Sequence, residues 1–198
     1  MGFSHSWVAV QGVDSGQILA ALGMEVREIP KWDSFLEERA LIDWRDGWLL
    51  VLSDDDEDAF EGSLSRLAKL GPAVACRVNE RVMYSEARGY SAGAEVWRVV
   101  HDPDEDESLY ALDVSGTPPP QLEGIIRDKR AQQDSEGGEE ADVDYIFDVP
   151  SELAQSICGF SLGEGDPDDI RFSELKKIGE ADVPPKSSGF FARLFGRR

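Results

Sequence analysis

The sequence is poor in metal-binding residues and in long apolar runs. Among its 198 residues are two cysteines, Cys76 and Cys158, and two histidines, His5 and His101. Their spacing matches no zinc pattern and includes no CxxC pair. No run approaches the roughly 20 apolar residues of a membrane span, and the first residues lack the basic and apolar segments of a signal peptide. We therefore expect a cytoplasmic protein with no metal, no cofactor and no transmembrane segment.

Basic residues are also scarce relative to acidic ones. The chain has 20 lysines and arginines against 40 aspartates and glutamates, for a net charge of −20. This balance argues against nucleic acid as a partner, because binding phosphates requires a basic patch. It suits a soluble protein, or one whose basic partner is attracted over a long range. The apolar fraction of 41% is ample for a packed core.

The first half of the chain alternates between strand and helix patterns. Asp14 or Ser15 can cap a helix that Gly23 ends, and Ser53 is a second candidate cap. Residues 30–47 mix bulky apolar and charged side chains, which predicts a long loop with a helical turn. The pattern predicts strands at 6–12, 24–29 and 47–53 and helices at 14–23 and 54–71.

The second half predicts an antiparallel meander followed by helices. A hairpin turn is expected at Asn79–Glu80, with Cys76 as a core residue. The expected elements are strands from 73 to 116, a helix at 117–133, an exposed loop at 134–142, a strand at 143–149, a helix at 150–159 and a last element at 170–178. The units at 6–24 and 143–160 share a strand–cap–helix–glycine pattern that a duplication could explain.

These patterns predict an α+β fold, with a mainly antiparallel sheet flanked by three to four helices. Residues 1–178 are expected to form a single domain. Residues 179–189 have the composition of a flexible, disordered linker, and residues 190–198 form a short amphipathic, basic tail.

Two G-x-S-x-G matches raise the question of a hydrolase. They are GYSAG at 89–93 and GFSLG at 159–163. A nucleophile elbow needs a strand before its serine and a helix after it. Ser91 is expected in a hairpin turn and Ser161 after a helix, and no histidine follows Ser161. Glycine-containing turns explain both matches better than catalysis does. A hydrolase or transferase using Ser91 or His101 is the enzyme alternative.

The acidic runs and the tryptophans have simple structural interpretations. Residues 54–58 and 102–107 contain D-x-D-x-D spacing but lack the glycine and the later glutamate of a calcium loop. The five tryptophans are Trp7, Trp32, Trp44, Trp48 and Trp97. Three of them lie in one irregular stretch, where exposure would indicate a partner surface. Burial against the sheet is the favoured interpretation.

The C-terminal tail differs sharply in charge from the rest of the chain. From Lys186 onward the charge is +4, whereas the other 16 basic and 40 acidic residues give −24. As a helix, the tail would place its apolar side chains on one face with arginines beside it. The candidate docking residues are Phe190, Phe191, Arg193, Leu194, Phe195, Arg197 and Arg198.

Nine residues are too few for a stable isolated helix, which needs about 12–15 residues in water. A surface must therefore stabilise the tail. It could be the anionic inner face of the membrane, an apolar groove on a partner protein, or the acidic body of this chain. A single short tail would attach only weakly and reversibly.

Three stretches carry a resemblance to a known group of proteins. FSHSWVAVQG, VACRVNERVMYSEA and VDYIFDVPSELAQSICGF resemble a family of bacterial proteins with no assigned activity. The resemblance spans most of residues 3–160 and implies no catalytic residue. The tail alone is similar to the membrane-targeting ends of some bacterial division proteins.

The sequence thus favours binding over catalysis. We expect a cytoplasmic binding or adaptor protein that docks weakly to a partner protein or to the inner membrane face through its tail. A related alternative is an acidic immunity-like protein that neutralises a basic toxin. Its contact surface would be the acidic loops at 102–107 and 134–142.

Overall fold

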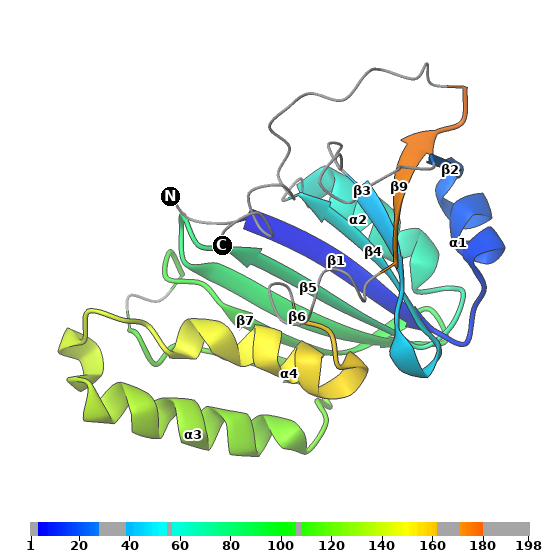
Figure 1. Ribbon diagram of the computed structural model, residues 1–198. Coiled ribbons are helices and arrows are strands. Elements are labelled where there is room, and N and C mark those ends of the chain that lie inside the picture. The colour runs from blue at the N-terminus through cyan, green and yellow to red at the C-terminus, as the bar shows by residue number, and fades with distance from the viewer. Residues whose placement is uncertain (1–3, 28–38, 55–56, 106–107, 162–170, 180–198) are drawn as a thin grey trace.

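The computed structural model describes residues 4–27, 39–54, 57–105, 108–161 and 171–179. In this part of the chain a nine-stranded antiparallel sheet is flanked by four α-helices (Figure 1). The α+β class and the antiparallel sheet are therefore as the sequence predicts. No helix in these ranges is long and apolar enough to cross a membrane.

The elements follow the expected alternation, with differences at two places. The strands are β1 (Ser4–Gln11), β2 (Met24–Arg27), β3 (Arg39–Asp43), β4 (Trp48–Asp54), β5 (Ala73–Asn79), β6 (Tyr84–Ser91), β7 (Ala94–His101), β8 (Asp113–Gly116) and β9 (Arg171–Lys177). The helices are α1 (Ser15–Leu22), α2 (Glu57–Leu67), α3 (Gln121–Ser135) and α4 (Val149–Cys158), with short 3-10 turns η2 (Arg45–Gly47), η3 (Gly138–Glu140) and η4 (Ile146–Asp148).

The strand order is β2-β9-β3-β4-β1-β5-β6-β7-β8. Strands β5 to β8 form the predicted meander, each paired with the next one along the chain. Strand β9 is the last element predicted at 170–178. It lies between β2 and β3, two strands from the first quarter of the chain.

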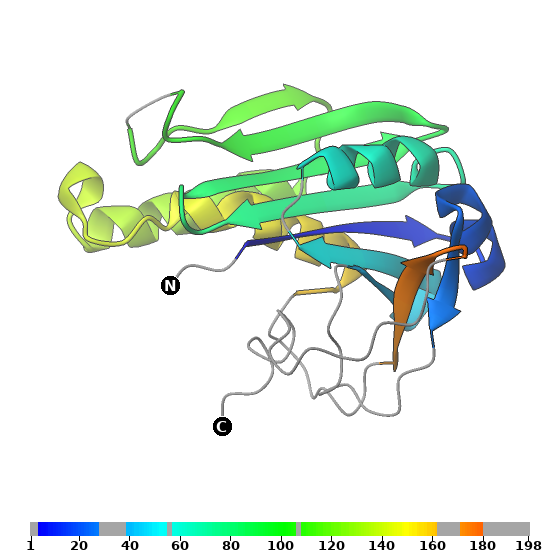
Figure 2. The same cartoon turned by 90° about the horizontal axis from the view of Figure 1, so that it is seen from above.

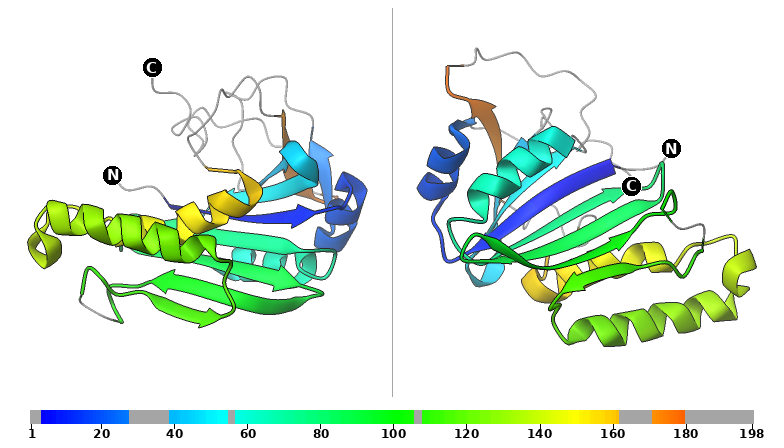
Figure 3. Two further views of the ribbon diagram at one scale, coloured as in Figure 1. Left: turned by 90° about the horizontal axis from the view of Figure 1, so that it is seen from below. Right: turned by 180° about the vertical axis from the view of Figure 1, so that it is seen from behind.

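Each face of the sheet carries its own helices and its own core (Figures 2 and 3). Alternate residues of β1 divide between the two cores. Val8 and Val10 pack with residues of α1 and α2, including Ile18 and Phe60. Trp7 and Ala9 pack with the opposite core, which α3 and α4 cover. The period-two alternation of a strand explains this division.

Residues 39–43 were expected to lie in a loop, and that prediction is wrong. They form β3, which pairs with β4 in a hairpin. Asp46 and Gly47 lie in the turn with φ of 59° and 76°, the backbone that an Asp-Gly pair adopts most readily in hairpin turns. Ser53 likewise belongs to β4 and does not begin α2.

The prediction of a strand at 143–149 is also wrong. Residues 146–148 form the 3-10 turn η4, and α4 begins directly after it. The Asp144 carboxylate accepts hydrogen bonds from the backbone N–H groups of Ile146 (3.0 Å) and Phe147 (3.1 Å). These bonds cap a helical turn. Because the second unit has no strand, the duplication suggested by 6–24 and 143–160 loses its basis.

Candidate functional site

The proposed tail lies outside the described residues. Residues 180–198 include all seven candidate docking residues and nearly all of the linker. Their binding role therefore stays a prediction, and the site described here is built from the folded body.

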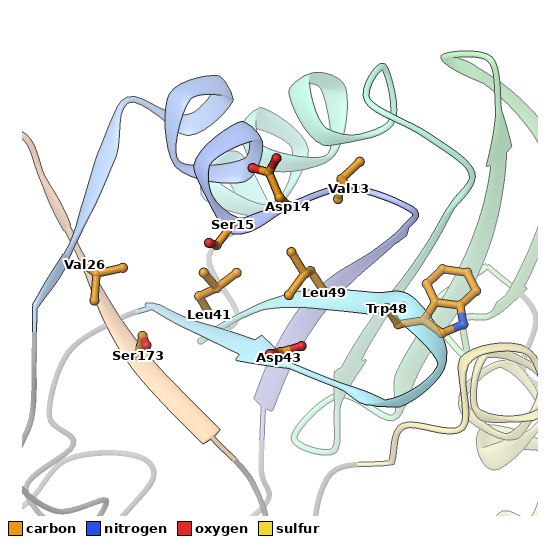
Figure 4. Close-up of a pocket in the computed structure, with 10 residues that line it drawn as sticks. Val13, Asp14, Ser15, Val26, Leu41, Asp43, Trp48, Leu49 and Ser173 are labelled. Atoms are coloured by element: carbon orange, nitrogen blue, oxygen red, sulfur yellow. The ribbon is translucent and has the colours of Figure 1, made fainter.

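A hollow of about 500 Å³ opens beside the start of α1 (Figure 4). Residues of β2, β3, β4 and β9 also line it. Its apolar lining includes Leu41 and Leu49, which are buried in the core beneath α1 and α2. Val13 and Val26 add further apolar surface. The hollow therefore has an apolar floor that is continuous with one of the two cores.

The polar groups of the hollow are acidic or neutral. Asp14 and Asp43 contribute carboxylates, and Ser15 and Ser173 contribute hydroxyls. None of the described residues that line the hollow is basic. Carboxylates beside apolar surface suit a cationic group carried on an apolar stem, because the charge and the stem each find a matching environment.

Hydrogen bonds hold the wall of the hollow in place. Asp14 caps α1, with its Oδ1 accepting from the Gln17 backbone N–H at 2.9 Å. The Gln17 side chain in turn accepts from the Asp14 backbone N–H at 3.0 Å. Gly12 N–H donates to the Gly47 carbonyl at 3.1 Å, which joins the β1–α1 connection to the β3–β4 turn.

Sequence reasoning found the cap but missed the hollow. Asp14 was considered only as a helix cap, while Asp43 and Ser173 were not considered at all. The signal that could have found the hairpin wall was Asp46-Gly47 between two apolar runs. No local signal could have placed Ser173 beside Leu41, because β9 joins β3 across more than 120 residues.

At the other end of the molecule, the two acidic loops of the immunity-like alternative lie together. The Glu139 carboxylate accepts from Ser108 Oγ (2.5 Å) and from the Leu109 backbone N–H (2.8 Å). The Tyr110 hydroxyl donates to Asp134, and this bond raises the pKa of Tyr110 to about 12. We call the described residues 102–105 and 134–142 the acidic end.

A buried ion pair lies behind the acidic end. His101 Nε2 is 2.8 Å from Asp144 Oδ2, and His101 Nδ1 is 2.9 Å from the Ala111 carbonyl oxygen. A carbonyl oxygen and a carboxylate are both acceptors, so this arrangement favours the doubly protonated ring. Burial lowers the pKa of His101, but the bonds to Asp144 and Ala111 outweigh it and raise the pKa above 6.5.

A second buried charge cluster lies on β6 and β7. The Glu86 side chain is 0% exposed and accepts from Arg88 Nε and Nη2, each at 2.9 Å. Arg98 Nη2 is 3.2 Å from the same carboxylate. Arg88 also reaches Glu61 of α2 at 2.7 Å. The cluster therefore links α2 to strands β6 and β7 of the meander.

The enzyme alternative finds no assembled site among the described residues. Ser91 and His101 lie at opposite ends of the β6–β7 hairpin, since Ser91 pairs with Ala94 and His101 with Ser85. Six residue steps along a strand separate such positions by about 20 Å. His101 is also fully buried. In the described ranges, no group of three or more His, Cys, Asp or Glu side chains is placed to hold a metal ion.

The tryptophans that the structure describes support their structural interpretation. Trp7, Trp48 and Trp97 are buried, and Trp44 packs against the same core. Trp32 lies outside the described residues. Cys76 is buried as predicted, and Cys158 is buried as well.

No protein-family model, curated protein or solved structure matches the chain. The resemblance to a bacterial family therefore stays a prediction. The function has to be argued from the residues themselves.

Proposed function

We propose that this is a non-enzymatic binding or adaptor protein that docks weakly through residues 190–198. The surface that receives it is a partner protein or an anionic membrane. The observation that carries the proposal is the charge division of the chain, +4 from Lys186 onward against −24 for the rest. An apolar, cationic segment attached to an acidic body is suited to bridge that body to another surface.

The described residues of the body support a binding role for the tail. Its exposed large apolar side chains are six scattered aliphatic residues, and none of them is aromatic. Two of its buried charged residues, His101 and Glu86, are paired within the fold. The tail gathers aromatic and basic residues that could make an outside contact.

The tail would bind to a membrane and to a partner protein through different interactions. On an anionic membrane, each basic group near the surface contributes about 1 kcal/mol. On a partner protein, the three phenylalanines and Leu194 would fill an apolar groove, so the binding would depend less on salt. Either attachment would be weak and reversible for a single tail.

Flotation with vesicles of anionic or neutral lipid tests the membrane arm, and affinity capture tests the protein arm. The full chain is compared with Phe190→Ala/Phe191→Ala/Leu194→Ala and with Arg193→Gln/Arg197→Gln/Arg198→Gln. A body variant, Lys69→Gln, controls for loss of charge elsewhere. The tail variants should lose vesicles or a captured partner, and the control should keep them. Equal behaviour of all four proteins would refute the proposal.

The geometry of the acidic end favours a second candidate, an immunity-like protein that binds a basic toxin. Glu139 and Asp134 of the second loop are bonded there to residues 108–110, which follow the first loop along the chain. Most described acidic residues of these loops, such as Glu105, Glu136 and Asp142, are exposed. A basic partner would be steered to such a surface at low salt.

Charge neutralisation at the acidic end tests this candidate. Glu105→Gln/Glu136→Gln/Asp142→Asn should weaken capture of a basic protein such as a cationic nuclease, mostly through a slower association rate. Glu123→Gln in α3 removes an exposed charge elsewhere and serves as the control. An unchanged association rate in the triple variant would exclude the acidic end as the contact surface.

A further inference from the structure

The hollow beside α1 is a pocket whose wall is held together by a backbone hydrogen bond. Its rim joins the β1–α1 connection to the β3–β4 turn through the bond from Gly12 N–H to the Gly47 carbonyl. Its floor is formed by Leu41 and Leu49, and Figure 4 shows Ser15 and Asp43 around that floor. A pocket of this size can take one or two bulky side chains.

The chemistry of the hollow selects an apolar group that carries a positive charge. Asp43 is exposed. Asp14 lines the hollow while its Oδ1 caps α1. Together they place two carboxylates beside an apolar surface to which no described lining residue adds a basic side chain. A phenylalanine or leucine would cover the floor, and a neighbouring guanidinium would meet the carboxylates.

We propose that the hollow is a binding site for the basic, apolar segment 187–198 of this same chain. The segment matches the hollow in charge and in apolar character, with Phe190, Phe191 and Arg193 close together. The described chain continues from Ser173 of β9, which lines the hollow, to Gly179. The eleven residues 179–189, which precede Phe190, span up to about 36 Å, so Phe190 can reach the hollow.

Docking within one chain has a consequence for the proposed function, although the inference goes beyond it. A tethered segment meets its site at an effective concentration of about 1 mM, so even weak affinity keeps a large share of the segment bound. A membrane or partner would then have to compete with the hollow. The hollow would thereby set a threshold for docking outside the molecule.

Paramagnetic relaxation in the full chain tests the site. A nitroxide label is attached at Ser188→Cys, since Cys76 and Cys158 are buried and burial raises the pKa of both thiols. The amide signals of Ser15, Val26 and Asp43 should lose intensity, whereas Val143 at the far end should not. The loss should persist when the labelled protein is diluted.

A charge variant and a matched control sharpen the test. Asp14→Asn/Asp43→Asn removes both charges but keeps α1 capped, because asparagine caps as well as aspartate. It should restore the signals at the hollow, while Asp104→Asn/Asp142→Asn at the acidic end should not. Signals unaffected in the parent, or equally affected in both variants, would overturn the proposal.

Mixing distinguishes docking within one chain from docking between chains. Isotope-labelled protein without nitroxide is combined with nitroxide-labelled protein that carries no isotope. Signal loss in this mixture as large as in the single protein would assign the segment to a second copy and overturn the intramolecular site. Flotation measures binding of the tail to vesicles, whereas the nitroxide experiment measures its binding to the hollow. A negative result in one experiment therefore does not contradict the proposal that the other tests.

Discussion

Packing against a neighbouring tryptophan explains why residue 89 is a glycine, and a catalytic role is not needed to explain it. It pairs with Trp97 across β6 and β7, and the indole covers the space where a side chain would project. A Cβ at Gly89 would lie 2.0 Å from Trp97 Nε1. The GYSAG match thus combines a packing glycine with a turn, in which Ala92 and Gly93 have φ of 50° and 79°.

Gly89→Ala should lower the free energy of unfolding by about 1–3 kcal/mol, because the buried indole must move. Gly62→Ala is the matched control, since nothing lies within 4 Å of the added Cβ in α2. There the same change should stabilise by about 0.5–1 kcal/mol, through helix propensity. Urea unfolding measures both, and a neutral Gly89→Ala would show that Trp97 is loosely held.

The His101–Asp144 ion pair predicts a window of pH in which it stabilises the fold. Burial lowers the pKa of His101, but the bonds to Asp144 and Ala111 outweigh it, so the pKa is raised and the contribution of His101 is lost as pH rises through that value. Burial raises the pKa of Asp144, but the bond and charge of His101 outweigh it, so the pKa is lowered and the contribution of Asp144 is lost as pH falls through it. The pair should contribute most between the ordinary values of 3.8 and 6.5.

Thermal unfolding across this pH range measures the effect. The gap in Tm between the parent and His101→Gln/Asp144→Asn should be largest inside the window and should shrink at more acidic and more alkaline pH. A gap that is constant with pH would mean that neither pKa differs between the folded and unfolded states, and it would contradict the stabilising pair. The sequence alone could not name this pair, because His101 and Asp144 are distant along the chain.

Gln133, in the last turn of α3, organises the connection to α4. Its side chain is buried and donates to the carbonyl oxygens of Gly138 (2.8 Å) and Val143 (3.2 Å). Its Oε1 accepts from the Tyr145 backbone N–H at 2.8 Å. One amide therefore holds both ends of the loop that forms half of the acidic end.

Gln133→Met keeps the volume of the side chain but removes all three bonds. Because buried backbone groups would be left unpaired, we expect a loss of about 2–3 kcal/mol. Hydrogen exchange at the Tyr145 amide should accelerate more than exchange in β5. Gln132→Met, an exposed neighbour on α3, is the control. Equal exchange in both variants would contradict the role of Gln133.

Secondary structure was predictable wherever local signals agreed. Helix α1 has its cap at Asp14 and its left-handed glycine at Gly23, and both ends were predicted. Residues 143–149 were mistaken for a strand because their apolar content outweighed the Asp144 cap. The hollow was missed for another reason, namely that its wall depends on β9, whose partners are set by tertiary pairing.

Net charge acts on the whole molecule as a destabilising repulsion. At a net charge of −20, the whole chain should gain stability when salt screens its surface. Raising ionic strength from about 10 mM to 150 mM shortens the Debye length from about 30 Å to about 8 Å. We expect Tm to rise by about 2–4 °C, the shift that about 1 kcal/mol produces in a chain of this size.

Thermal unfolding in increasing sodium chloride measures this gain. The acidic-end variant Glu105→Gln/Glu136→Gln/Asp142→Asn starts with less repulsion and should gain less. A fall in Tm with salt would show that ion pairs such as those of Glu86 outweigh the general repulsion.

The place of β9 in the sheet has a consequence for synthesis on the ribosome. Strands β2 and β3 emerge early, yet the strand that joins them is made more than 120 residues later. Until then, each of the two presents an unpaired backbone edge that a neighbouring nascent chain could join. A translation product halted before residue 171 should therefore aggregate or require a chaperone, although the meander is already complete.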